Sequence, residues 1–163
     1  MRGVCWREMT PHSSVMDEAI FACGCFWGVE VAFRNIVGVV DVRCGYTGGS
    51  LPNPTYKSVC AGKTGHAEAV KVTFDPTVVS YEHLVDSFWK MHDPSHGGVQ
   101  SHKKDQYRSE LFYATPEQQR IATVSREKWI VHSGKDVTTP LTKASAFYDA
   151  EEYHQNYHAK HKQ

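Results

Sequence analysis

The spacing of apolar residues along the chain predicts alternating strands and helices. Runs in which every second residue is apolar, such as Val70 and Val72, are typical of half-buried strands. Apolar residues three or four positions apart, such as Phe26, Val29 and Phe33, indicate the buried face of a helix. The predicted order is a strand at 18–22, a helix at 26–35, strands at 39–46 and 66–76, a helix at 80–92, a strand at 107–114 and a helix at 115–132.

This order is the split β-α-β-β-α-β pattern of ferredoxin-like folds. Because two strands follow one another without a helix between them, a flavodoxin-like parallel sheet fits less well. We therefore expect an α+β two-layer sandwich with additional C-terminal elements, namely a short extended piece and a polar end that can form a helix. A chain of 163 residues is large enough for one hydrophobic core. We expect an N-terminal tail at 1–18 and a single domain at 19–163.

Composition and charge exclude several classes of protein. The 18 basic and 18 acidic side chains cancel, so no net field attracts nucleic acid or an anionic membrane. No apolar run approaches the roughly 20 residues that span a bilayer, and no apolar segment of a signal peptide follows Met1. The five cysteines are an odd number confined to the first 60 residues, whereas secreted disulfide scaffolds usually have an even, spread set. We therefore expect a cytoplasmic monomer with free thiols.

Cys25 is a candidate nucleophile because it stands where the first predicted helix begins. The free N–H groups and positive end of a helix stabilise a thiolate, which would lower the pKa of Cys25 below its usual value of about 8.5. Phe26 and Trp27 follow directly, and two consecutive helical residues cannot share one face. At least one ring should therefore project towards a ligand. The alternative is that both rings pack under the sheet and that Cys25 is an ordinary buried thiol.

Glu68 is a candidate general acid because it shares the alternation of Val70 and Val72. Its carboxylate should lie on the apolar face of its strand, where burial raises the pKa and preserves the proton near neutral pH. The alternative is an edge position at which Glu68 turns to water or pairs with a lysine. Tyr107 shares the alternation of Leu111, which predicts that its hydroxyl points inward, either as a core group or towards a substrate.

Four sequence blocks are too specific for chance: GCFWG at 24–28, GYTGGSLPNPTYKSVCAGKTGHAEAV at 45–70, QYRS at 106–109 and FYDAEEYHQNY at 147–157. Together they resemble the A-type peptide-methionine sulfoxide reductases. They occur in the family's order, and the match runs from about residue 19 to 157. The resemblance implies a catalytic domain that reduces methionine S-sulfoxide, in proteins and as the free amino acid, to methionine.

The resemblance also implies a role for each matching residue. Cys25 would attack the sulfoxide sulfur, and Glu68 would protonate the departing oxygen. Tyr56 and Tyr107 would donate hydrogen bonds to that oxygen. The residues expected to line the substrate cavity are Phe26, Trp27, His154 and Tyr157. No metal or organic cofactor is implied.

The reaction that the resemblance implies converts Cys25 to a sulfenic acid. A thiol must then reduce this sulfenic acid, and in this family the reductant is thioredoxin. Many members carry further cysteines beyond the YHQ segment, but this sequence has none after Cys60. We therefore expect an internal cysteine or an external thiol to attack Cys25, with Cys60 as the first internal candidate and Cys5 as the second. Cys23 is too close to form an unstrained bridge, and Cys44 shares the alternation of the core valines.

A second departure from the family lies in the stretch 95–105. The family often has an Arg-Gln-Gly-Asn-Asp-like sequence there, whose aspartate joins the site. Asp105 lies near this place without aligning to it, and the sequence leaves its role open.

Two other functions compete with catalysis. His154, His158 and His161 are spaced to share one helical face, which would suit a zinc-binding protein if cysteines supplied further ligands. A non-catalytic domain could instead bind methionine-containing peptides through Phe26 and Trp27.

Overall fold

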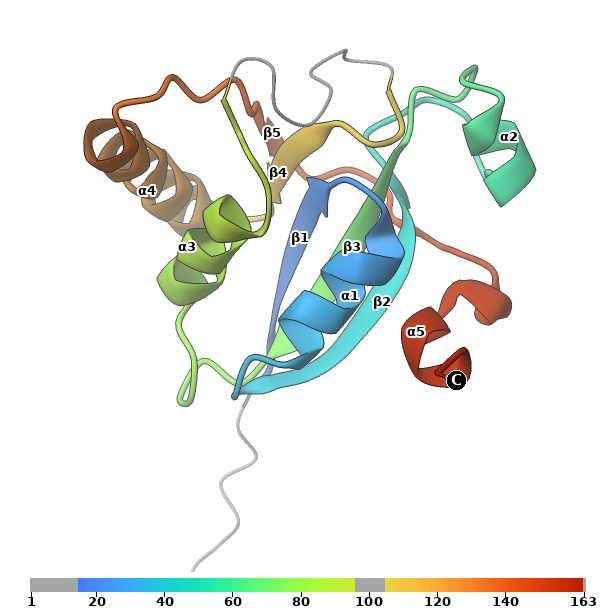
Figure 1. Ribbon diagram of the computed structural model, residues 1–163, viewed down its shortest axis with the longest axis horizontal. Coiled ribbons are helices and arrows are strands. Elements are labelled where there is room, and N and C mark those ends of the chain that lie inside the picture. The colour runs from blue at the N-terminus through green and yellow to red at the C-terminus, as the bar shows by residue number, and fades with distance from the viewer. Residues whose placement is uncertain (1–14, 96–104, 163) are drawn as a thin grey trace, which may run out of the picture.

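The computed structural model describes residues 15–95 and 105–162 and arranges six strands in one sheet (Figure 1). The strands are β1 (Asp17–Cys23), β2 (Val39–Thr47), β3 (Ala67–Phe74), β4 (Ser109–Tyr113), β5 (Leu141–Lys143) and β6 (Tyr148–Asp149), in the order β5-β4-β1-β3-β2-β6. The inner four strands pair antiparallel, and β3 lies between β1 and β2. This is the split arrangement of a ferredoxin-like sheet, so the predicted α+β class is confirmed.

The helices α1 (Phe26–Arg34) and α3 (Tyr81–Met91) cover the same face of the sheet (Figure 1). The ring of Phe21 on β1 stacks on Phe33 of α1 at 4.8 Å and on Phe88 of α3 at 5.3 Å between centroids. The long helix α4 (Pro116–Ser133) packs on α3, where the Trp89 indole N–H donates to the Ser125 hydroxyl at 3.0 Å. The remaining helical pieces are α2 (Tyr56–Cys60), the 3₁₀ turn η1 (Glu152–His154) and α5 (Tyr157–Lys160).

Local capping explains where the two longer helices begin and where α4 ends. The Ser80 hydroxyl accepts the backbone N–H of His83, and the Thr115 hydroxyl accepts that of Gln118. Gly134 ends α4 in the left-handed conformation at φ 66°, which glycine adopts without a steric penalty. These signals are local, and the helix boundaries follow the sequence prediction closely.

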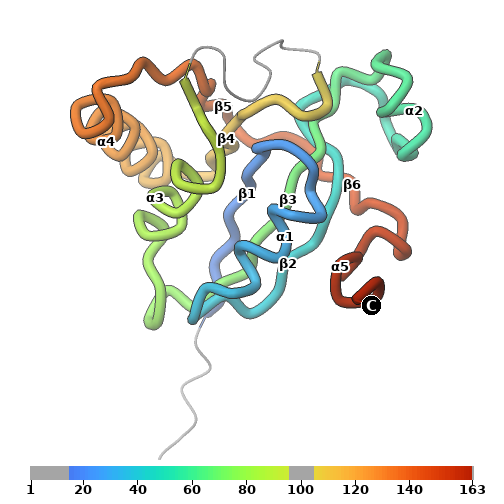
Figure 2. Tube along the Cα trace, viewed as in Figure 1, coloured from blue at the N-terminus to red at the C-terminus, as the bar shows by residue number. Residues whose placement is uncertain are grey.

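The chain between β5 and β6 runs from one edge of the sheet to the other (Figure 2). Phe147 in this segment packs against a small cluster on the sheet that includes Ala67 and Phe112. Gly45 is required here, because a Cβ at that position would lie 2.4 Å from the Phe147 ring. The start of β3 is consequently buried on both of its faces.

The structure differs from the sequence prediction just before β4. The strand predicted at 107–114 begins at Ser109, because the chain turns first: the Asp105 carboxylate accepts the backbone N–H of Tyr107 at 2.8 Å. Tyr107 therefore lies in a turn and is 38% exposed, so the prediction that it points inward from a strand is wrong. Asp105 shapes this turn through its side chain.

Two further points concern the rest of the chain. Cys60, predicted in a loop, is the last residue of α2. Most of the predicted tail at 1–18, including Cys5, lies outside the described residues, and β1 begins at Asp17. Within the described ranges, no helix has the length and apolar character that a membrane crossing requires.

Candidate active site

Cys25 lies at the junction of β1 and α1, where it is the N-terminal capping residue of the helix. Gly24 makes this junction by adopting φ 108°, a conformation that residues with a Cβ rarely tolerate. The Cys25 side chain is exposed, whereas Cys23 and Cys44 are buried among core residues. The alternative of a buried thiol is therefore wrong for Cys25, and Cys60 is the other exposed cysteine in the described part of the chain.

The pKa of Cys25 is raised overall, opposite to the predicted decrease, although the N–H groups of the helix start act in the predicted direction. Although the residue is exposed, partial burial of its sulfur raises the pKa of the thiol, and the backbone N–H groups of Trp27 and Gly28 each lower it by less. The charge of Glu68 raises the pKa further. The site therefore holds a thiol while Glu68 is ionised, and protonation of Glu68 removes one of the causes that disfavour the thiolate.

Glu68 lies on the helix-facing side of β3 and is 1% exposed, in line with the fully buried Val70 and Val72. One carboxylate oxygen accepts the Phe26 backbone N–H at 3.3 Å, and the other accepts the Gln106 side-chain amide at 3.1 Å. Burial raises the pKa of Glu68 to about 7, because these two neutral donors compensate only part of the lost hydration. The predicted burial and raised pKa of Glu68 are confirmed.

Gln106 connects Glu68 to Cys60, and the sequence analysis did not identify it as a site residue. Its backbone carbonyl accepts the backbone N–H of Glu68 at 2.8 Å. Its side-chain nitrogen lies 3.1 Å from the Glu68 carboxylate and 3.6 Å from the Cys60 sulfur. The Cys60 thiol and the Glu68 carboxylate thus share one amide. The position of Gln106 next to Tyr107 in the QYRS block was a usable signal.

Both predicted tyrosines belong to the same cluster. A hydrogen bond with the Cys60 thiol, together with burial, raises the pKa of Tyr56. Burial and the charges of Glu68, Cys25 and Cys60 raise the pKa of Tyr107, while a hydrogen bond with Gln106 lowers it by less. The Tyr107 hydroxyl is therefore within electrostatic reach of both exposed thiols and of the buried carboxyl.

The two rings after Cys25 have different surroundings. Phe26 is 1% exposed and packs 5.2 Å from the His154 ring, measured between centroids. Trp27 is half-buried, and its indole N–H donates to Nδ1 of His154 at 3.0 Å. The Tyr157 ring stacks on Trp27 with centroids 3.7 Å apart. Phe26 is thus buried, whereas Trp27 packs at the margin of the core and is partly exposed; that it faces a ligand stays a prediction.

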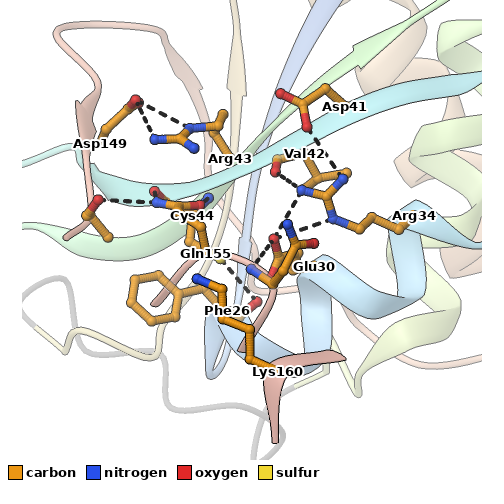
Figure 3. A network of polar contacts seen from close by, with 12 residues as sticks. Phe26, Glu30, Arg34, Asp41, Val42, Arg43, Cys44, Asp149, Gln155 and Lys160 are labelled. Carbon is orange, nitrogen blue, oxygen red and sulfur yellow. Dashed lines mark hydrogen bonds and ion pairs between the residues drawn. The ribbon is translucent and has the colours of Figure 1, made fainter. Parts of the chain in front are cut away.

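Two buried polar side chains attach the C-terminal segment to β2 and α1 (Figure 3). The Gln155 amide accepts the Cys44 N–H at 2.8 Å and donates to the Cys44 carbonyl at 2.9 Å, as a neighbouring strand would. The Glu30 carboxylate accepts the Asn156 N–H at 3.0 Å and pairs with Arg34 at 3.1 Å. The sequence analysis missed both, although Glu30 falls on the apolar face of its predicted helix. These contacts hold the segment that carries His154 and Tyr157 against the site.

The three histidines of the zinc alternative do not share one helix. His154 belongs to η1 and is bonded to Trp27, whereas His158 follows in the separate helix α5. Residues 15–95 and 105–162 contain no group of three or more His, Cys, Asp or Glu side chains placed to hold a metal ion. The geometry of this part of the chain gives the zinc alternative no support.

The site brings together an exposed thiol, which is a candidate nucleophile, and a buried carboxyl with a raised pKa, which is a candidate general acid. The profile of a protein family described as "Peptide methionine sulfoxide reductase" matches residues 17–163. The chain belongs to this family.

Relatives of known name and structure agree with this assignment. The Escherichia fergusonii protein "Peptide methionine sulfoxide reductase MsrA" is 46% identical over 163 residues, covering 96% of this chain and 77% of that protein. A Methanothermobacter thermautotrophicus protein of the same name is 52% identical over 145 residues, covering 86% and 85%. The crystal structure of Mxr1 from Saccharomyces cerevisiae in reduced form has a TM-score of 0.80 at 34% identity, covering 91% and 87%. Mxr1 in complex with Trx2 has a TM-score of 0.65 at 25% identity, covering 93% and 91%.

Proposed function

We propose that this protein reduces methionine S-sulfoxide to methionine, with Cys25 as the nucleophile and Glu68 as the proton donor. The observation that carries the proposal is an exposed thiol next to a buried carboxyl whose pKa is raised to about 7. Membership of the family supports the reaction. The substrates are methionine sulfoxide residues in proteins and peptides, together with free methionine sulfoxide.

The first step transfers oxygen from the substrate to Cys25. The Cys25 thiolate attacks the sulfoxide sulfur while Glu68 donates its proton to the sulfoxide oxygen, which makes that oxygen a better leaving group. This attack forms a sulfur–sulfur bond between Cys25 and the substrate, and the protonated oxygen leaves the substrate sulfur as hydroxide. The hydroxide then attacks the Cys25 sulfur, which breaks the sulfur–sulfur bond, releases methionine and leaves Cys25 as a sulfenic acid. The substrate gains two electrons, Cys25 loses two, and Glu68 is left ionised.

The thiolate and the protonated acid favour one another. Because ionised Glu68 raises the pKa of Cys25, the thiolate forms most readily when Glu68 holds its proton. Cys25 and Glu68 then hold one proton between them, and it lies on the Glu68 carboxyl. This is the arrangement that the reaction needs, because Cys25 is then the nucleophilic thiolate and Glu68 is the acid. A substrate that excludes water around both groups would strengthen this coupling.

Aromatic groups on two sides would hold the sulfoxide. Trp27 offers an apolar surface for the methyl group on sulfur, with Phe26, His154 and Tyr157 packed behind or against it. Phenol hydroxyls of Tyr56 and Tyr107 would donate hydrogen bonds to the oxygen. An apolar wall opposite a pair of donors distinguishes the two epimers at sulfur, and the family resemblance favours the S epimer.

Electrons for the next cycle come from thiols, without a metal or organic cofactor. The Cys60 thiol would attack the Cys25 sulfenic acid, which forms a disulfide and releases water, and an external dithiol would then reduce that disulfide. The shared contact of Gln106 with Cys60 and Glu68 supports Cys60 as the resolving cysteine, with Cys5 as the second candidate. The complex of the yeast relative Mxr1 with Trx2 supports thioredoxin as the external dithiol.

We also propose that the protein acts as a monomer in the cytoplasm, where its thiols stay reduced. The odd number of cysteines, all within the first 60 residues, supports this setting. Light scattering of the purified protein and fractionation of the source cells test the two statements.

The function is tested by following methionine formation from the separated S and R epimers with a dithiol present. The wild type should reduce the S epimer and leave the R epimer, and Cys25→Ser should form no methionine while its thermal stability is kept. A domain that only binds peptides would contradict the proposal by giving no methionine in the wild type and equal peptide binding in Cys25→Ser.

Recycling is tested separately with Cys60→Ser and Cys5→Ser. Cys60→Ser should release the first methionine at the wild-type rate but should form no internal disulfide on Cys25 in peptide mapping. If Cys5→Ser shows that loss instead, Cys5 is the resolving cysteine. If both variants turn over like the wild type, the external dithiol attacks Cys25 directly.

A further inference from the structure

Glu151 accepts hydrogen bonds from three separate parts of the chain. One carboxylate oxygen accepts the Tyr46 hydroxyl at 3.3 Å, and the other accepts the Tyr153 hydroxyl at 3.1 Å. Both oxygens lie near the backbone N–H of Tyr56, at 3.2 and 3.3 Å. Tyr46 belongs to β2, Tyr56 begins α2, and Glu151 itself stands just before η1. One carboxylate therefore joins the sheet, α2 and the C-terminal segment.

The contact with Tyr56 fixes the start of α2. The first N–H groups of a helix have no partner within the helix, so an outside acceptor determines how the helix end is held. Glu151 provides that acceptor from the segment that packs against Trp27. The side chain of Tyr56 extends from this anchored residue, and its ring lies 4.5 Å from the His154 ring, measured between centroids.

The same carboxylate acts on His154. Trp27 donates to Nδ1 of His154, so the neutral ring must carry its proton on Nε2. Nε2 is buried and has no hydrogen-bond partner within the described residues. A Glu151 oxygen lies 3.8 Å away, which is too far for a hydrogen bond but close enough to attract the N–H group. Glu151 thus helps to orient the histidine that holds Trp27.

We propose that Glu151 is a positioning residue, which places the Tyr56 hydroxyl for the sulfoxide oxygen by holding the backbone of Tyr56. This inference rests on the proposed function, because it assigns the Tyr56 hydroxyl to the substrate. Glu151 does not touch the reacting atoms. It acts through Tyr56 and, to a smaller extent, through His154 and Trp27.

A double-mutant cycle tests the proposal with Glu151→Gln and Tyr56→Phe. Glu151→Gln removes the charge and one acceptor, and the resulting displacement of Tyr56 should lower kcat/KM for methionine S-sulfoxide about tenfold in the wild-type background. In the Tyr56→Phe background the displaced hydroxyl no longer exists. The further loss on Glu151→Gln should there be less than about threefold, from the His154 contact alone.

Glu152→Gln is the matched control. Glu152 is the next residue in the chain, and its side chain is 80% exposed. One of its carboxylate oxygens lies 3.5 Å from the guanidinium of Arg43, which is a weak ion pair. Replacement of Glu152 should change kcat/KM less than about twofold in either background. Glu151→Ala removes the whole carboxylate and is a more severe change than Glu151→Gln. If the alanine variant does not fold, Glu151→Gln alone tests the proposal.

Equal losses from Glu151→Gln in the two backgrounds would overturn the proposal, because a general loss of structure would cost the same with or without the Tyr56 hydroxyl. Unchanged kcat/KM in Glu151→Gln would overturn it as well. If the wild type forms no methionine in the same assay, the proposed function fails and this inference fails with it. If the wild type is active and the cycle is additive, only the inference about Glu151 fails.

Discussion

Two carboxylates near α1 are equally buried but have different partners. Glu68 and Glu30 are each 1% exposed, and each accepts a backbone N–H, at 3.3 and 3.0 Å. Glu30 lies 3.1 Å from the guanidinium of Arg34. The second partner of Glu68 is the neutral amide of Gln106 at 3.1 Å.

The difference lies in the charge of the second partner. A cation compensates the lost hydration of a buried carboxylate, whereas a neutral amide compensates only part of it and leaves the proton tightly held. The region around Glu30 therefore anchors the C-terminal segment, and the region around Glu68 is the one that we propose supplies a proton. Burial of a carboxylate is thus insufficient evidence for an acid, and the partner must be identified.

The largest expected effect is on catalysis in the Glu68 region. Glu68→Gln removes the transferable proton and keeps the shape, so single-turnover methionine formation should fall about 10²- to 10⁴-fold. Glu30→Gln, measured below its unfolding temperature, should stay within about threefold of the wild type, because Glu30 only anchors a segment. Similar losses in the two variants would remove the distinction between the regions.

The next effect is on the pH dependence of stability. The pKa of Glu68 is raised from 4.5 in the unfolded chain to about 7, so the folded state binds this proton more tightly. Between pH 4.5 and pH 7 the free energy of unfolding must therefore fall as the pH rises, and the shifted pKa of Glu68 contributes about 3 kcal/mol to this fall. Glu68→Gln should therefore gain stability relative to the wild type on going from pH 4.5 to 8. Urea unfolding of both proteins at pH 4.5 and pH 8 checks this. An equal change in the free energy of unfolding of the two proteins between these pH values would contradict it.

A somewhat smaller effect is expected on stability in the Glu30 region. Glu30→Gln leaves Arg34 without its buried partner, and because Arg34 is 29% exposed the loss should be about 2 kcal/mol, below that of a fully buried pair. Asp41 is the control, since it pairs with the same guanidinium at 3.3 Å but is 51% exposed. Asp41→Asn should cost less than about 1 kcal/mol in thermal or urea unfolding. A reversed order of the two variants would show that burial does not decide the strength of these pairs.

The smallest effect concerns Tyr107, which borders only the Glu68 region. Tyr107→Phe removes one proposed donor to the sulfoxide oxygen and should lower kcat/KM by roughly tenfold, or about 1.4 kcal/mol. Because the residue lies in an exposed turn, the unfolding temperature should stay unchanged. Wild-type kinetics in this variant would remove Tyr107 from the site.

The features that the sequence predicts correctly depend on neighbouring residues. Alternation in β3 and helical spacing in α1 require only short stretches of chain, and the same alternation places Glu68 on the buried face. The pKa of Cys25 was predicted in the wrong direction, because burial of the thiol depends on the surrounding fold and Glu68 is 43 residues away in the sequence. The roles of Gln106, Glu151 and Gln155 likewise depend on contacts between distant segments.

The most direct test of the account is to mix the reduced protein with one equivalent of methionine S-sulfoxide and no external reductant, then to map the oxidised cysteines. The account predicts one equivalent of methionine and an oxidised Cys25, found as a trapped sulfenic acid or as a disulfide of that residue. Methionine formed while Cys25 remains a free thiol would contradict it.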